Sequence, residues 1–245
     1  MQEKAEKIAY WLLKDFNKAV YQFNMIEEGD RIAVAVSGGK DSLTLLELLK
    51  FRLASAKEKY EIVAVHVSGD ANGPSCPIHP PLVDWLEANG YAFVVEEFKL
   101  PDGEKIPLNC HRCTWNRRKQ IFEAARRENC NVVALGHHAD DLAQTTLMNL
   151  IFHGKVETIA PTADYFGGVF RLIRPMCFLS ETDIQRFAKE ANFPDPPPLC
   201  PRSELSQRQT VQKFIRETQK QFPNTRYNLL QAGLKYTLET EKNEQ

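Results

Sequence analysis

The hexapeptide Ser37-Gly-Gly-Lys-Asp-Ser42 has the residue types of an anion-binding loop. A glycine pair directly after the apolar run Arg31–Val36 lets the backbone turn sharply and approach an anion closely. A helix that follows would direct its free N–H groups and positive dipole end at the same anion. We therefore expect Ser37, Gly38, Gly39, Lys40, Asp41 and Ser42 to bind phosphate, the alternative being a glycine turn without a ligand.

Two common nucleotide motifs do not match this loop. In the pattern G-x-x-x-x-G-K-[ST], Val34 occupies the position of the first glycine and Asp41 the position of the Ser or Thr. The dinucleotide fingerprint G-x-G-x-x-G needs glycines beyond Gly39 that the sequence lacks. The loop is therefore of another kind.

Three cysteines form a second chemical constellation. Cys110-His-Arg-Cys113 is a C-x-x-C pair at the expected start of a helix, and Cys200 follows a proline-rich stretch. Structural zinc sites take four ligands, but Ser203 stands where a second C-x-x-C beginning at Cys200 would end. Three thiolates suit a [4Fe–4S] cluster with one iron open. From the cysteines alone, an iron–sulfur cluster, zinc and no metal remain open.

Alternating strands and helices are expected to position these residues. Apolar runs at 31–36, 61–67, 91–95, 132–135 and 169–173 predict strands, and Asp41–Leu53 predicts the helix after the loop. Such alternation is typical of an α/β fold with a mostly parallel sheet covered by helices on both faces. An apolar stripe over Glu6–Phe23 predicts an amphipathic helix before the sheet.

The last third of the chain is predicted to be helical. Ser180 and Asp183 resemble a capping box, the prolines of 193–198 predict a stiff linker, and a later helix is expected to place Val211, Phe214 and Ile215 on one face. We expect an N-terminal helix at 1–25, a nucleotide-binding domain at 26–179 and a small C-terminal helical region at 180–245 that contributes Cys200.

The composition is that of an ordinary globular protein. The chain has 245 residues, is 43% hydrophobic and 26% charged, and carries a net charge of -1, which neither favours nor excludes a nucleic-acid partner. It has no apolar run of the roughly 20 residues that a membrane span needs and no signal-peptide pattern, so we expect a cytoplasmic protein. Its six cysteines are then not expected to form disulfides.

Several motifs together resemble one family. The S-G-G-x-D-S loop matches the PP-loop ATP pyrophosphatases, and the chain resembles their tRNA 2-thiocytidine synthetase branch from about residue 20 to about residue 216. The matching segments are 23–30, Cys110-x-x-Cys113 with Arg117-Arg118, Leu135-Gly-His-His-Ala-Asp-Asp141, Ile173-Arg-Pro175 and Cys200. The segment 68–79 departs from the pattern.

This resemblance implies a fold, cofactors and site residues. It implies an adenine-nucleotide α-hydrolase-like, Rossmann-like fold, a [4Fe–4S] cluster on Cys110, Cys113 and Cys200, and the use of ATP with Mg²⁺ to replace a tRNA base carbonyl oxygen with sulfur. His66 and Gly136 would lie near the nucleotide, and Asp141, Arg117 and Lys40 would act in catalysis. The implied partners are tRNA, a sulfur donor such as a cysteine desulfurase or free sulfide, and, as an option, a second copy of the chain.

The remaining candidates have simpler interpretations. We expect His137 and His138 to make supporting hydrogen bonds, Cys130 and Cys177 to be buried hydrophobes, and Cys76 with His79 to be unrelated loop residues. The basic residues 112, 117–119 and 126–127 are expected on one helix, as an RNA contact or a solvated face. Two other functions stay open: an enzyme that transfers sulfur to or amidates a small metabolite, and a non-catalytic nucleotide-binding protein with a structural metal.

Overall fold

The computed structural model describes residues 2–69, 79–100, 103–104, 106–198 and 207–243. Their strands form one six-stranded sheet in the order β3-β2-β1-β4-β6-β5. Its strands are β1 (Arg31–Ala35), β2 (Glu61–Ser68), β3 (Phe93–Glu97), β4 (Val132–Ala134), β5 (Thr162–Tyr165) and β6 (Phe170–Ile173). All neighbouring pairs are parallel except β5 with β6, which confirms the mostly parallel sheet.

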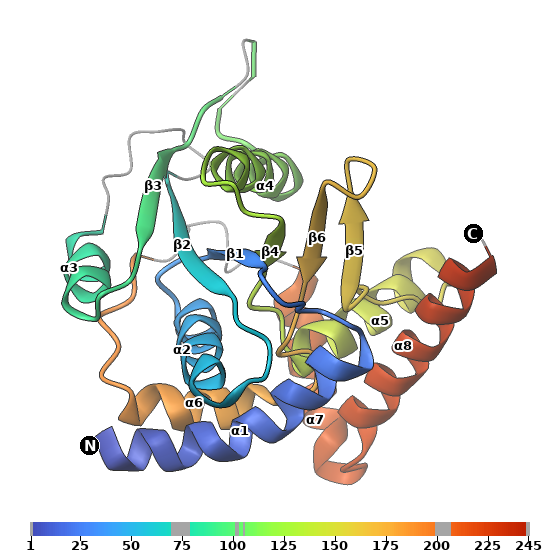
Figure 1. Cartoon of the computed structure of the whole chain (residues 1–245). Coiled ribbons are helices and arrows are strands. Elements are labelled where there is room, and N and C mark those ends of the chain that lie inside the picture. The colour runs from blue at the N-terminus through green and yellow to red at the C-terminus, as the bar shows by residue number, and fades with distance from the viewer. Residues whose placement is uncertain (1, 70–78, 101–102, 105, 199–206, 244–245) are drawn as a thin grey trace.

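Eight helices surround this sheet in the described part of the chain. They are α1 (Gln2–Gln22), α2 (Lys40–Ser55), α3 (Pro80–Ala88), α4 (Cys110–Arg127), α5 (Ala139–His153), α6 (Glu181–Glu190), α7 (Gln207–Gln221) and α8 (Thr225–Asn243). Figure 1 shows α4 on one face of the sheet and α2, α6 and α1 on the other, so helices cover both faces as expected. None of these helices has both the length and the apolarity to cross a membrane.

The alternation of side chains along β1 explains the two layers. Ile32 and Val34 join the hydrophobic cluster that contains the leucines of α2, whereas Ala33 joins the cluster that contains Phe122 of α4. Because successive side chains of a strand point to opposite faces, one short run serves both cores. Because β1, β2, β4 and β6 run parallel, their carboxyl ends meet at one edge of the sheet.

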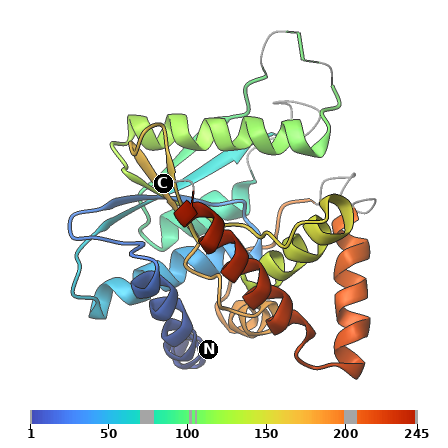
Figure 2. The same cartoon turned by 90° about the vertical axis from the view of Figure 1, so that its right-hand side faces the viewer.

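The C-terminal helices pack on the rest of the molecule. The capping interaction of α6 is confirmed, because the Ser180 side chain accepts a hydrogen bond from the Asp183 N–H. Helix α6 packs against α1 and α2, while α7 and α8 pack against α5 (Figure 2). Leu230 and Leu234 of α8 belong to the same core cluster as the leucines of α2. The domain boundaries at 25 and 179 stay predictions.

The helix expected to carry Val211, Phe214 and Ile215 on one face is α7, but only part of that face is buried. Val211 and Ile215 of α7 are buried, but Phe214 is 57% exposed. Helix α7 packs against α5 and α8, and its Gln212 and Arg216 also hydrogen-bond Glu181 of α6, while Phe214 remains exposed to solvent. A helix on the periphery of the molecule buries a narrower stripe than the sequence pattern suggested.

Candidate active site

The phosphate loop lies between β1 and α2 and is closed by its own serines. The Ser42 hydroxyl accepts a hydrogen bond from the Ser37 N–H at 3.1 Å and donates one to the Gly39 carbonyl at 2.9 Å. Gly38 has a φ of +83°, which favours glycine. Gly39 is the N-cap of α2 and provides no side-chain cap, so the first turn of α2 presents uncapped N–H groups to this loop.

Two close backbone contacts require glycine around this loop. A Cβ at Gly136, which follows β4, would stand 3.2 Å from the Asp41 carbonyl oxygen. A Cβ at Gly38 would stand 2.9 Å from Cδ of Pro197, in the proline-rich stretch after α6. The loop is therefore confined between the end of β4 and the segment that leads toward Cys200, which itself lies outside the described residues.

Lys40 carries a positive charge beside the loop. Its ammonium lies 2.8 Å from an Asp41 carboxylate oxygen and 3.3 Å from one of Glu181, the first residue of α6. Burial lowers the pKa of Lys40, but the two carboxylates outweigh burial and raise it. Burial likewise raises the pKa of Glu181, whereas Lys40 outweighs burial and lowers it. Lys40 is therefore cationic at neutral pH and positioned to exchange these carboxylates for phosphate oxygens.

His138 brings two aspartates together at the start of α5. Its backbone N–H donates to Asp141 Oδ2 at 3.1 Å, which caps the helix. Its ring Nε2 lies 3.4 Å from Asp141 Oδ2 and 3.7 Å from Asp41 Oδ1. The expectation that the histidine pair makes supporting side-chain hydrogen bonds stays a prediction, because Nδ1 of each ring has no hydrogen-bond partner among the described residues. Asp41 of α2 and Asp141 of α5 thus both approach the same buried imidazole. Such a pair of carboxylates is suited to binding a divalent cation.

A cavity of about 270 Å³ opens at these aspartates and includes residues that sequence patterns did not suggest. Helix α7 supplies Arg208, Gln209 and Gln212 to its lining. The Arg208 guanidinium lies 3.7 Å from Asp141 Oδ1. No motif links α7 to the loop, so only its packing on α5 could show this contribution.

The cationic Arg174 and an uncharged His137 lie beside the end of β4. The half-buried His137 has its pKa lowered to about 3 by burial and by the charges of Arg174, Arg208 and Arg118. Arg174 is 4% exposed, and burial lowers its pKa to about 10. Its Nη1 donates to the Ala160 carbonyl at 2.5 Å, while its Nε has no hydrogen-bond partner among the described residues. This region favours an anion.

Arg117 and His66 lie near the ends of neighbouring strands. Arg117 donates from Nη1 to the Val67 carbonyl at 3.2 Å and also to the Gly69 carbonyl, both at the carboxyl end of β2. His66 Nδ1 donates to the Val36 carbonyl at 2.8 Å, and burial lowers the pKa of His66. Both side chains thus border the edge that carries the loop, and their proposed roles stay predictions.

The C-x-x-C pair occupies the first turn of α4, as expected. The N-cap Asn109 accepts a hydrogen bond from the Arg112 N–H at 2.9 Å, which starts the helix at Cys110. Cys110 is exposed and Cys113 half-buried, and residues three apart share a helix face. The two described thiols therefore fit a cluster, although no group of three metal-binding side chains occurs within the described ranges.

The other cysteines differ from this pair. Cys130 and Cys177 are buried, and burial raises their pKa values to about 11 and about 12, which confirms them as hydrophobic side chains. Cys76 lies outside the described residues. Nε2 of His79 donates to the Asp195 carbonyl at 2.6 Å, so this histidine attaches the proline-rich stretch to the start of α3.

A parallel sheet with an S-G-G-K-D-S loop between its first strand and helix defines a PP-loop protein. The model of the PP-loop domain family matches residues 12–194. A tRNA-cytidine(32) 2-sulfurtransferase of Erwinia tasmaniensis is 37% identical over 228 residues, which cover 91% of this chain and 73% of the relative. The Acidovorax ebreus enzyme of the same name is 33% identical, with 95% and 74% coverage. The chain belongs to the PP-loop superfamily and, within it, to the tRNA-cytidine 2-sulfurtransferase family.

A solved structure supports the fold. The U34-tRNA thiolase NcsA from Methanococcus maripaludis, solved with its [4Fe-4S] cluster, superimposes with a TM-score of 0.70 at 23% identity. The match covers 92% of this chain and 78% of that one. The similarity confirms the α/β architecture expected from the sequence.

Proposed function

We propose that this protein is an ATP-dependent sulfurtransferase that replaces a carbonyl oxygen of a tRNA base, most simply cytidine, with sulfur. One observation carries the proposal: the phosphate loop and the C-x-x-C turn open on the same edge of the sheet. The loop follows β1, and Arg117, two turns into α4, reaches the carboxyl end of β2 beside it. The named relatives supply the acceptor class, because they act on tRNA cytidine.

In the first half-reaction the base carbonyl oxygen attacks the α-phosphorus of ATP. The bond between the α-phosphorus and the bridging oxygen breaks, and pyrophosphate leaves with that electron pair. Lys40 and the N–H groups of the loop would neutralise the departing charge. Asp41 and Asp141 would hold Mg²⁺ against the phosphates, a role supported by the approach of both carboxylates to Nε2 of His138.

In the second half-reaction sulfide adds to the activated ring carbon and AMP leaves with the carbon–oxygen bond pair. Cys110 and Cys113, with Cys200 as the third ligand, would hold a [4Fe–4S] cluster. When bound, such a cluster would supply an iron without a protein ligand as the site that carries sulfur. The contact of Pro197 with Gly38 supports a third ligand in the segment that follows. Arg117 would steady the anionic group near the reacting carbon.

The test uses protein purified and reconstituted with iron and sulfide under anaerobic conditions. With unmodified tRNA, ATP and Mg²⁺, we expect thiolated cytidine by nucleoside mass spectrometry, and AMP and pyrophosphate in equal amounts. Cys110→Ser should lose iron and product, whereas Cys130→Ser, at a buried thiol away from the site, should keep both. Formation of ADP, or full activity of Cys110→Ser, would contradict the proposal.

A further inference from the structure

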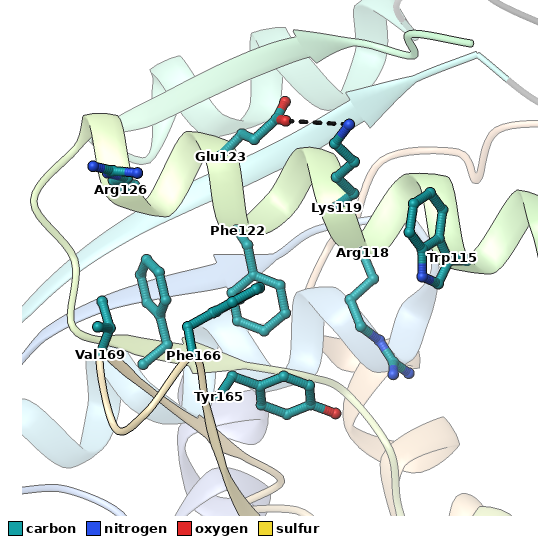
Figure 3. A pocket seen from close by; sticks show the side chains of 10 residues that line it. Trp115, Arg118, Lys119, Phe122, Glu123, Arg126, Tyr165, Phe166 and Val169 are labelled. Carbon is teal, nitrogen blue, oxygen red and sulfur yellow. Dashed lines mark ion pairs between the residues drawn. The ribbon is translucent and has the colours of Figure 1, made fainter. Parts of the chain in front are cut away.

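A second, larger cavity lies away from the phosphate loop, between α4 and the β5–β6 hairpin. It has a volume of about 780 Å³, within the usual range for sites that bind small organic groups. Figure 3 shows Phe122 and Arg118 of α4 directed toward Tyr165 and Phe166 of the hairpin. Its lining combines aromatic rings and cations, among them Trp115, Arg118, Phe122, Arg126, Tyr165 and Phe166.

The floor of this cavity is a fixed aromatic cluster. Phe122 is 6% exposed, and its ring centroid lies 5.1 Å from that of Tyr165 and 5.3 Å from that of Phe170. These rings belong to the core, so the floor exists without a ligand. A planar group that enters the cavity would meet a rigid apolar surface.

The rim, in contrast, exposes aromatic side chains that the fold does not need to expose. Trp115 is 46% exposed and Phe166 is 66% exposed. Phe166 also has a φ of +55° at the hairpin tip, a conformation that is costly for a bulky side chain. Its ring nevertheless remains edge-on to Phe122, with centroids 5.3 Å apart. Strain together with exposure indicates that this ring has a function beyond folding.

Cations alternate with these rings along α4. Trp115, Arg118, Phe122 and Arg126 follow at three- and four-residue steps and share one face of the helix. Lys119 is paired with Glu123 at 3.8 Å, but Arg118 and Arg126 have no ion pair within the described part of the chain. Interleaved rings and unpaired cations match the chemistry of a single nucleic-acid strand, in which bases stack and phosphates carry charge.

We propose that this cavity binds an unpaired base of the RNA substrate, stacked on Phe166 or Trp115, with the neighbouring phosphates on Arg118 and Arg126. The inference rests on the proposed function and assigns it an RNA-binding site outside the phosphate loop. Arg118 connects the two regions, since its charge acts on His137 at the end of β4. A duplex would not bind in this way, because its bases are already stacked on one another.

The experiment measures RNA affinity of the whole protein by fluorescence anisotropy. The probes are an RNA hairpin with an unpaired loop and a fully paired RNA duplex of equal length. Phe166→Gly removes the ring and also relieves the backbone strain, so it separates a binding effect from a folding defect. We expect Phe166→Gly and Trp115→Ala each to weaken hairpin binding about tenfold or more and to change duplex binding little.

Arg126 tests the contribution of charge to RNA binding, and residues of the same types elsewhere serve as controls. Arg126→Ala should weaken the binding of both RNAs and reduce the number of counterions released on binding by about one. Trp11→Ala and Arg186→Ala serve as controls, because these exposed residues line a different cavity of about 510 Å³ between α1 and α6. Both controls should bind the hairpin like the unchanged protein, and Phe166→Tyr should retain its affinity.

The outcomes separate this inference from the proposed function. If the unchanged protein binds and thiolates RNA while Phe166→Gly and Trp115→Ala bind the hairpin equally well, the cavity assignment is wrong and the proposed function stands. If the unchanged protein neither binds nor thiolates RNA, the proposed function fails. If Phe166→Gly instead turns a dimer into a monomer in sedimentation velocity and keeps full hairpin affinity, the cavity is a protein interface and the assignment is overturned.

Discussion

Gly136, two residues after the end of β4, lies so close to the first turn of α2 that a methyl group in place of its hydrogen would stand 3.2 Å from the Asp41 carbonyl oxygen. The same methyl group would stand 3.3 Å from the Ser42 nitrogen. The S-G-G-K-D-S loop is thus positioned by the end of a strand about a hundred residues away in the sequence. Its geometry depends on the sheet as much as on its own glycines.

Gly136→Ala is therefore expected to raise the KM for ATP. The added methyl group must move the loop by a few tenths of an ångström, and such misplacement costs on the order of ten- to hundredfold in a positioned site. Steady-state pyrophosphate release over a range of ATP concentrations measures the effect. Gly90→Ala is the control: Gly90 has a φ of +67° and open space around its Cβ position, so it should lose stability and keep its KM. Equal KM values for both variants would contradict the steric argument.

We expect Asp141 to have a structural role and a chemical role that two substitutions can distinguish. Its Oδ2 caps α5 through the His138 N–H, and an asparagine can accept the same hydrogen bond. Asp141→Asn should therefore keep the free energy of unfolding but lower kcat on the order of 100-fold through the lost charge. Asp141→Ala should in addition lose about 1 kcal/mol of stability. Urea denaturation and pyrophosphate assays distinguish the two; a fully active Asp141→Asn would refute the catalytic role.

The cysteines should react with iodoacetamide in two classes. At pH 8 a thiol with a pKa of about 11, such as Cys130, is ionised in roughly one molecule in a thousand, and burial also shields it. Cys177, with a pKa raised to about 12, should react still less. Peptide mapping of the metal-free protein should show alkylation of Cys110 within minutes and of Cys130 and Cys177 only after unfolding. Rapid alkylation of Cys177 in the folded protein would contradict its burial.

His137 should make the protein less stable in mild acid. The unfolded chain takes up a proton at His137 near pH 6.5, whereas the folded chain does so only near pH 3. Between these values the unfolded state binds more protons, so stability falls as the pH falls. From pH 7.5 to pH 5, His137→Gln should lose roughly 2 kcal/mol less than the unchanged protein. Urea titrations at both values provide the measurement, with the exposed His153→Gln as a control that should follow the unchanged protein.

Local sequence patterns predicted the elements that carry the loop but not the elements that complete the site. The β-branched runs 31–36 and 61–67 and the S-G-G-K-D-S turn have strong local signals, and the structure confirms them. Strand β5 was not predicted, because Thr162–Tyr165 is short and contains Asp164, and it forms only as the antiparallel partner of β6. Its pairing depends on tertiary context.

Glu181 and Arg208 show the same limit at the level of single residues. In the sequence, Glu181 is an ordinary first-turn acid of a capped helix, and Arg208 is one of several basic residues in a polar segment. Only the packing of α6 under α2 and of α7 on α5 brings them to Lys40 and Asp141. Contacts between helices that are distant in the sequence, here α2 with α6 and α5 with α7, leave no fixed spacing in a single sequence.

The positions of Pro197 and Arg208 have a thermodynamic consequence. Pro197 lies against Gly38 of the phosphate loop, and Arg208 lies 3.7 Å from Asp141. The residues just before and just after the segment that carries Cys200 therefore both contact the candidate site. If Cys200 holds the proposed cluster, ATP and the cluster would be linked ligands. Such coupling is reciprocal: whatever factor ATP contributes to retention of iron, iron must contribute to the affinity for ATP. Under the proposed function, a protein that lacks its cluster would then bind ATP less tightly, and less ATP would be spent when no sulfur can be transferred.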